Sequence, residues 1–168
     1  TKYAKEEAAA MINDLTQSQI AATRALVVQG FTDGRTVRET SRALVAVLEE
    51  GGGIQTMGAM FAGPTRGLTK RGATAVYNRG ASLAAKGMSQ GQIAKHLDTY
   101  GGRLRKARAK AIARTETMRA SNQGRLEGMR QAQLNGLLTA HARKQWQTSR
   151  NDVCPICVGL SGVTAEIE

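Results

Sequence analysis

Apolar residues recur every three or four positions along most of the chain, which predicts a helical protein. The first predicted helix covers residues 3–29, with Gly30 as its stop and a turn at residues 32–34. The positions expected on its buried side are Ala8, Met11, Ile12, Leu15, Gln19, Ala22 and Leu26. A second predicted helix covers residues 36–50 and stops at the glycine triplet 51–53. Its expected buried stripe consists of Val37, Ser41, Leu44, Val45 and Leu48.

The pattern changes after residue 50. Residues 54–63 are rich in Gly and Met and poor in charge, which indicates a loop or a short helix, and residues 64–67 are typical of a break. We therefore expect an N-terminal helical region, residues 1–63, followed by a second region, residues 64–168. Thr69 begins the next predicted helix and Gly87 ends it. The face expected to be buried carries Ala73, Val76, Tyr77, Gly80, Leu83 and Ala84.

The longest predicted helix lies in the second region. Ser89 is expected to cap a shorter helix that ends at Tyr100, where Gly101 and Gly102 break or bend the chain. From residue 103 to about 138 there is no proline and there are few β-branched residues, which favours one long helix. Only Glu116 and Glu127 oppose its many cations. These cations are Arg103, Arg105, Lys106, Arg108, Lys110, Arg114, Arg119, Arg125 and Arg130.

The last thirty residues have a different character. Residues 144–149 predict a short strand and residues 150–152 a turn, after which the two cysteines Cys154 and Cys157 enclose Pro155. The predicted fold class is therefore mainly α, with several helices that include one long basic helix and with a small C-terminal strand and cysteine-turn element.

Composition narrows the partners. The 168 residues contain 24 Lys and Arg against 13 Asp and Glu, a formal charge of +11. Such an excess favours a polyanionic partner, either nucleic acid or an acidic protein surface, although a solvated basic surface is equally compatible with it. Aromatic residues are only 4% of the chain, too few for an extended platform that stacks single-stranded bases. No run of 18 apolar residues occurs, so we expect no membrane partner.

Three groups of residues in a fixed order resemble a known family. The first is Gly67-Leu68-Thr69 with Tyr77-Asn78 and Gly87-Met88-Ser89; the second is the run 111–117, Ala-Ile-Ala-Arg-Thr-Glu-Thr, with Asn122, Gly124 and Glu127. The third is Lys144, Trp146 and Thr148, then Asp152, Cys154-Pro155-x-Cys157 and Leu160-x-Gly162. Together they resemble the phage Mu protein F-like head morphogenesis family of minor head proteins, over about residues 67–163. Residues 1–63 resemble no family that we can name.

The resemblance implies a structural role in a bacteriophage head. The implied partners are the portal protein, the major capsid or scaffold protein and, in some members, packaged double-stranded DNA. The implied location is the virion, with the host cytoplasm as the site of assembly. The resemblance also implies a continuation with further cysteine and histidine residues, so we expect the 64–168 region to be truncated at its C-terminal end.

Cys154 and Cys157 have the spacing of a zinc half-site, because thiolates three positions apart on a turn can reach one metal ion. Zinc needs two more ligands, and neither His96 nor His141 stands at an established spacing. We expect any zinc site to be completed by residues beyond Glu168, with free or disulfide-bonded thiols as the equal alternative. A thioredoxin-like motif is a weaker interpretation, because it requires a βαβ context.

The long helix carries a polar signature, Arg114, Glu116, Arg119 and Asn122. Residues three apart share a face, so Glu116 can pair with Arg119, and Arg119 can reach Asn122. One interpretation is a buried clasp that orients the strand of Trp146 or a neighbouring subunit, and the resemblance favours it. The other is a solvated helix face whose ion pairs contribute little. We expect Trp146 itself to be a packing anchor on the long helix or the cysteine turn.

Five cations form the predicted DNA or partner contact: Arg103, Arg105, Lys106, Arg108 and Lys110. Contacts from such a cluster to phosphates would depend on salt and not on base sequence. The first hypothesis is a structural head protein that is not an enzyme. The second is a nonspecific DNA-binding module, and the third is a part of a larger enzyme or toxin chain. No nucleophile–base pair or phosphate-cradling loop supports the third.

Overall fold

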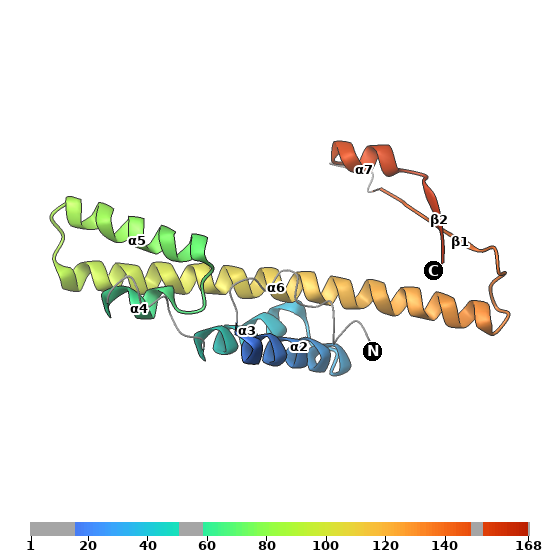
Figure 1. Cartoon of the computed structure of the whole chain (residues 1–168), viewed down its shortest axis with the longest axis horizontal. Helices are drawn as coiled ribbons and strands as arrows, with labels where there is room; N and C mark the ends of the chain where they lie inside the picture. The colour runs from blue at the N-terminus through green and yellow to red at the C-terminus, as the bar shows by residue number, and fades with distance from the viewer. Residues whose placement is uncertain (1–15, 51–58, 149–152, 168) are drawn as a thin grey trace. The chain divides into compact units, whose positions relative to one another are not determined.

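The computed structural model describes residues 16–50, 59–148 and 153–167. The chain is mainly helical, with a two-stranded antiparallel sheet near its C-terminal end, so the predicted fold class is confirmed (Figure 1). It divides into two compact units, Thr1–Ala120 and Ser121–Glu168. The expected boundary between residues 51 and 64 stays a prediction, since residues 51–58 lie outside the described part. The predicted helical residues 3–15 lie outside it too.

Two antiparallel helices open the described chain, α2 (Gln17–Thr32) and α3 (Val37–Glu50). Thr16 and Gln19 form a reciprocal capping box at the start of α2, which satisfies amide groups that have no partner within the helix. Thr36 and Glu39 do the same for α3, with 2.7 Å between the Thr36 nitrogen and the Glu39 carboxylate. These hydrogen bonds hold the pKa of Glu39 below its ordinary value.

The prediction that Gly30 ends the first helix is wrong, because α2 continues to Thr32. Gly30 is buried against α3, and a Cβ atom there would stand 2.8 Å from the Thr40 hydroxyl oxygen. The glycine therefore allows two helices to approach each other and does not stop one. The buried stripe of α2 is also displaced by one position from the expected one beyond Gln19, to Thr23 and Val27.

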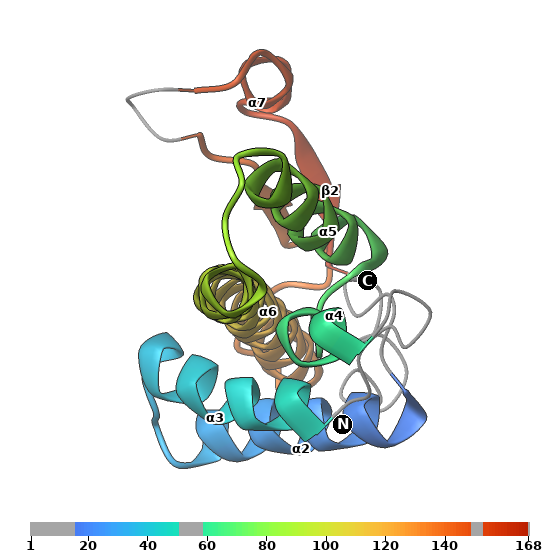
Figure 2. The same ribbon diagram turned by 90° about the vertical axis from the view of Figure 1, so that its left-hand side faces the viewer.

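The long helix α6 (Gln90–Leu134) carries the core of the first unit. Its residues 109–113 pack with α3 in one apolar cluster, formed by Leu44, Leu48, Ala109, Ile112 and Ala113. Its residues 93–104 pack with α4 (Ala59–Thr65) and α5 (Lys70–Ala85) around a second cluster, Leu68, Val76, Leu83, Ile93 and Leu97, with Phe61, Met88, Tyr100 and Leu104 against it. Figure 2, viewed nearly along α6, shows α5, α4 and α3 placed around one part of its circumference.

The prediction that Gly101 and Gly102 break the helix is wrong, because α6 runs through both without interruption. Gly101 is buried beneath α4, where a Cβ atom would stand 2.1 Å from the Pro64 carbonyl oxygen. The expected break at residues 64–67 is also displaced, because Pro64 lies inside α4. The turn falls at Gly67, whose φ of +67° suits glycine, and the backbone of Leu48 lies against it.

The other predicted boundaries are closer. The helix α5 begins directly after Thr69, close to the expected start, and the Thr69 hydroxyl oxygen caps it by accepting a hydrogen bond from the Gly72 amide. The long helix ends at Leu134 and not near residue 138, because Gly136 takes a φ of +70° just after it.

The second unit contains the end of α6 and three short elements: β1 (Arg143–Gln145), α7 (Pro155–Leu160) and β2 (Thr164–Glu166). Arg143 lies opposite Glu166, and Gln145 opposite Thr164, in an antiparallel pair. The predicted strand at 144–149 is therefore shorter and begins one residue earlier. Every described residue of this unit is at least partly exposed, so the unit has no buried core among the residues described.

The paired glycines of α6 give a direct test of the close approach to α4. We expect Gly101→Ala to lower the free energy of unfolding by about 1–3 kcal/mol, because the new methyl group overlaps the Pro64 carbonyl. Gly102→Ala is the matched control, since nothing lies within 4 Å of its added Cβ and alanine favours the helix by up to about 1 kcal/mol. Chemical denaturation of both variants measures the difference; equal effects would mean that the glycine is not needed for packing.

Candidate polyanion interface

The five predicted contact residues do not share one surface. Arg105 is turned toward the protein, with only 13% of its side chain exposed. Its guanidinium donates to a Glu49 carboxylate oxygen at 3.2 Å and to the Arg66 carbonyl oxygen at 2.8 Å. Arg108 donates to the Gly67 carbonyl oxygen at 2.9 Å. These two arginines connect α6 to α3 and to the turn before α5, so their guanidinium groups bind the protein itself and not a partner.

The other three predicted residues are exposed, and a fourth joins them. Arg103, Lys106 and Lys110 are exposed on α6 and follow one another at three-to-four-residue spacing, and the exposed Arg114 continues the row. We call Arg103, Lys106, Lys110 and Arg114 the basic stripe. It extends over about 17 Å at about 1.5 Å per residue. No acidic residue lies between its first and last members in the sequence.

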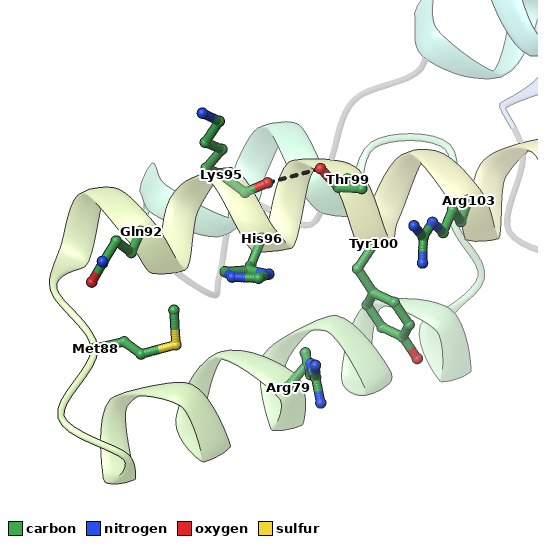
Figure 3. A pocket seen from close by; sticks show the side chains of 8 residues that line it. All are labelled: Arg79, Met88, Gln92, Lys95, His96, Thr99, Tyr100 and Arg103. Carbon is green, nitrogen blue, oxygen red and sulfur yellow. Dashed lines mark hydrogen bonds between the residues drawn. The ribbon is translucent and has the colours of Figure 1, made fainter.

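A groove of about 870 Å³ lies between α5 and α6 and shares Arg103 with the basic stripe. Arg79 of α5 and Lys95, His96 and Arg103 of α6 contribute its basic side chains. Figure 3 shows His96 and Tyr100 extending from α6 toward α5 and Arg79 on α5, whereas Lys95 points away from α5. The remaining lining residues are Met88, Gln92 and Thr99. Sequence reasoning did not find this groove, because Arg79 and Arg103 are 24 positions apart and only the helix pairing brings them to one site.

Glu116 is the buried charge of the first unit, with 1% of its side chain exposed. One carboxylate oxygen accepts from Arg119 at 3.3 Å, and the other has no hydrogen-bond partner among the described residues. Burial raises the pKa of Glu116, and the positive charges of Arg119 and of Arg24 on α2 lower it by less. The charge partner that the sequence did not reveal is Arg24, which comes from another helix.

The other members of the predicted clasp lie differently. Arg114 and Asn122 are exposed. Trp146 belongs to the second unit, where 51% of its surface is exposed and its backbone pairs with Val163 and Gly162. The ion pair of Glu116 with Arg119 thus matches the expected helix spacing, while the orienting role toward Trp146 stays a prediction.

The cysteine turn is the beginning of a short helix. Cys154 caps α7, and its sulfur accepts a hydrogen bond from the Cys157 amide at 3.3 Å. Hydrogen bonding from the Cys157 thiol and amide lowers the pKa of Cys154, and the same thiol contact raises the pKa of Cys157. A strand, the motif and a helix do follow one another here, but β1 and β2 are antiparallel, unlike the βαβ unit that the redox interpretation requires.

The two thiols fit half of a zinc site. Among the described residues no group of three or more His, Cys, Asp or Glu side chains gathers to hold a metal ion. His96 lines the groove of the first unit, and His141 is exposed in the second. The described residues alone therefore do not fit a four-coordinate zinc ion, and its completion from elsewhere stays a prediction.

No family model, curated protein or solved structure matches the chain. Within the described ranges, no helix is both long enough and apolar enough to cross a bilayer.

Glu116 provides a prediction with a defined pH dependence. A raised pKa in the folded state means that the native protein binds this proton more tightly than the unfolded chain. The tighter binding of this proton stabilises the folded state in full at a pH below the ordinary pKa of a glutamate. This contribution is lost as the pH rises through the raised pKa of Glu116. We therefore expect Glu116→Gln to be at least as stable as the parent at pH 7, with this advantage disappearing near pH 4.

Glu116→Ala is the contrasting variant. Unlike glutamine, alanine leaves a cavity and removes the oxygen that accepts from Arg119, so we expect Glu116→Ala to lose roughly 2–3 kcal/mol at pH 7. Denaturant unfolding of the three proteins at pH 4 and pH 7 measures both effects. If the glutamine and alanine variants lose the same stability at pH 7, the negative charge itself stabilises the fold and the interpretation is wrong.

Proposed function

We propose that this chain is a structural component of a bacteriophage head that acts in head morphogenesis by binding a larger protein, either the portal or the inner capsid. Its place would be the virion, after assembly in the host cytoplasm. The three groups of residues between 67 and 163 that resemble the head morphogenesis family support this proposal. We assign no catalytic role, because the buried carboxylate of Glu116 faces arginines of its own fold and suits packing better than chemistry.

One observation carries the proposal: the second unit exposes its apolar side chains. Nine large hydrophobic residues of this unit have 37–79% of their surface exposed. They are Met129, Leu134, Leu137, Leu138, Trp146, Ile156, Val158, Leu160 and Val163. A two-stranded sheet with no core is marginally stable by itself. Contiguous exposed apolar patches mark surfaces that another protein covers, and nine such side chains within one small unit support docking of this kind.

Particle composition tests this role. We expect the double variant Leu134→Ser and Leu137→Ser to fold as the parent does, since both side chains are more than three-quarters exposed, and to be incorporated into heads at least tenfold less. The matched control is Val28→Ser with Phe31→Ser, which removes two exposed apolar side chains from α2. Quantitative mass spectrometry of purified heads gives the copy number. Equal incorporation of both double variants would contradict docking through the second unit.

The basic stripe supports a second candidate function, nonspecific binding of duplex DNA. Its four cations are exposed, follow one face of a rigid helix and have no acidic residue among them in the sequence. Each phosphate that a cation neutralises releases counterions, so binding of this kind weakens steeply with salt. An acidic surface on a portal or capsid protein is the alternative ligand for the same stripe.

The salt dependence of binding distinguishes these ligands. We expect Lys106→Gln with Lys110→Gln to reduce the slope of log affinity against log salt by about 2, since each lost phosphate contact removes roughly 0.9. Arg38→Gln with Arg71→Gln removes the same charge from exposed positions on α3 and α5 and serves as the control. Fluorescence anisotropy with unrelated duplexes at several salt concentrations measures the slope. An unchanged slope would contradict DNA as the ligand of the basic stripe and would leave an acidic protein surface as its ligand.

A further inference from the structure

The groove between α5 and α6 has a chemical character of its own. Its lining includes two arginines, Arg79 and Arg103, with Lys95 at the edge pointing away from α5, and no carboxylate. The two arginines come from different helices, so a ligand in the groove would be held from both sides. A volume of about 870 Å³ lies within the range of small-molecule sites, roughly 300–1,000 Å³. The positive lining selects an anion.

Local hydrogen bonds decide which donors Gln92 and Thr99 can offer to that anion. The Gln92 amide oxygen already accepts from the backbone nitrogen and the hydroxyl of Ser89, at 3.1 and 3.0 Å. The polar group that Gln92 can still offer is its NH₂, which only donates. The Thr99 hydroxyl donates its hydrogen to the Lys95 carbonyl oxygen at 3.0 Å, as the dashed line in Figure 3 shows, so Thr99 offers no donor to the anion. Donors and positive charges thus outnumber acceptors, which suits the several oxygens of a phosphate group.

The groove also offers a fixed apolar surface. Met88 and Tyr100 line it and at the same time pack against the buried cluster of Leu68, Val76, Leu83, Ile93 and Leu97. Their positions are therefore set by the core. A planar ring can lie against the thioether of Met88 or the ring of Tyr100, and His96 stands between them along α6. A bare inorganic anion would leave this apolar part unused.

We propose that the groove between α5 and α6 binds one nucleotide unit, with its phosphate between Arg79 and Arg103 and its base or sugar against Met88 and Tyr100. The same chemistry is presented by a free nucleotide and by one residue of a nucleic-acid strand. In the second case the strand continues from Arg103 along the basic stripe toward Lys106. The site is independent of the head role, which depends on the second unit.

Arg79→Gln tests the groove without altering the stripe, because Arg79 lies on α5 and its side chain is exposed. Arg71→Gln is the matched control on the same helix, with the same charge change outside the groove. We expect Arg79→Gln to weaken binding about tenfold and Arg71→Gln less than twofold. The ligands are AMP, ATP and inorganic phosphate by calorimetry, and fluorescein-labelled single-stranded and duplex oligonucleotides by anisotropy, all with the whole chain.

Methyl NMR of the methionines locates the ligand. We expect the Met88 methyl resonance to move on titration and that of Met118, exposed on α6 outside the groove, to stay in place.

Arg79-dependent binding of AMP or ATP supports the site with a free nucleotide as its source, and Arg79-dependent binding of oligonucleotides alone supports it with a strand as the source. The proposal is overturned if no nucleotide or oligonucleotide binds, if phosphate alone binds as tightly as AMP, or if Arg71→Gln weakens binding equally. Failure here leaves incorporation into heads unaffected, so the two proposals fail separately.

Discussion

The first unit depends on how closely α4 approaches α6. The Pro64 carbonyl occupies the space that any side chain at position 101 would fill, and this contact places the turn at Gly67 beside α6. Arg105 and Arg108 then donate to the carbonyl oxygens of Arg66 and Gly67. A small-residue contact and two charge-assisted hydrogen bonds therefore hold the junction between the two apolar clusters.

The position of this junction decides which cations face outward. Once the face of α6 that carries Gly101, Arg105, Ala109 and Ile112 is buried, helical periodicity leaves the basic stripe on the other side. The same packing seats α5 beside the first turns of α6 and brings Arg79 to the groove that Arg103 lines. The basic stripe and the groove therefore both follow from which face of α6 is buried.

Much of the fold could be predicted from the sequence, because local signals carried it. The start of α5 near Thr69 depends on neighbours within a few residues, and so does the periodicity of Ala73, Val76, Gly80 and Leu83. Gly30 and Gly101 were misread because a glycine that stops a helix and a glycine that admits a neighbouring element have the same letter. Only the tertiary contact distinguishes them.

The candidate sites were less predictable for the same reason. The composition of residues 103–110 correctly indicated a basic segment. It could not show that Arg105 and Arg108 bind groups of their own fold, nor that Arg114 is exposed. The pairing of α2 with α6 brought Arg24 toward Glu116, and the pairing of α5 with α6 made the groove. Each of these depends on residues that are distant in sequence, where charge and spacing carry no signal.

The course of α6 has one more consequence. A single helix begins in a unit with two apolar clusters and continues past its last buried residue, Glu116, into a unit in which none of the described residues is buried. Tertiary packing and helical hydrogen bonds thus both protect the backbone amides of its first part, whereas helical hydrogen bonds are the main protection that the described residues give to its second part. The free energy needed to open the helix locally therefore falls toward Leu134. The segment that unfolds together with the first unit then ends inside a continuous helix and not at a loop.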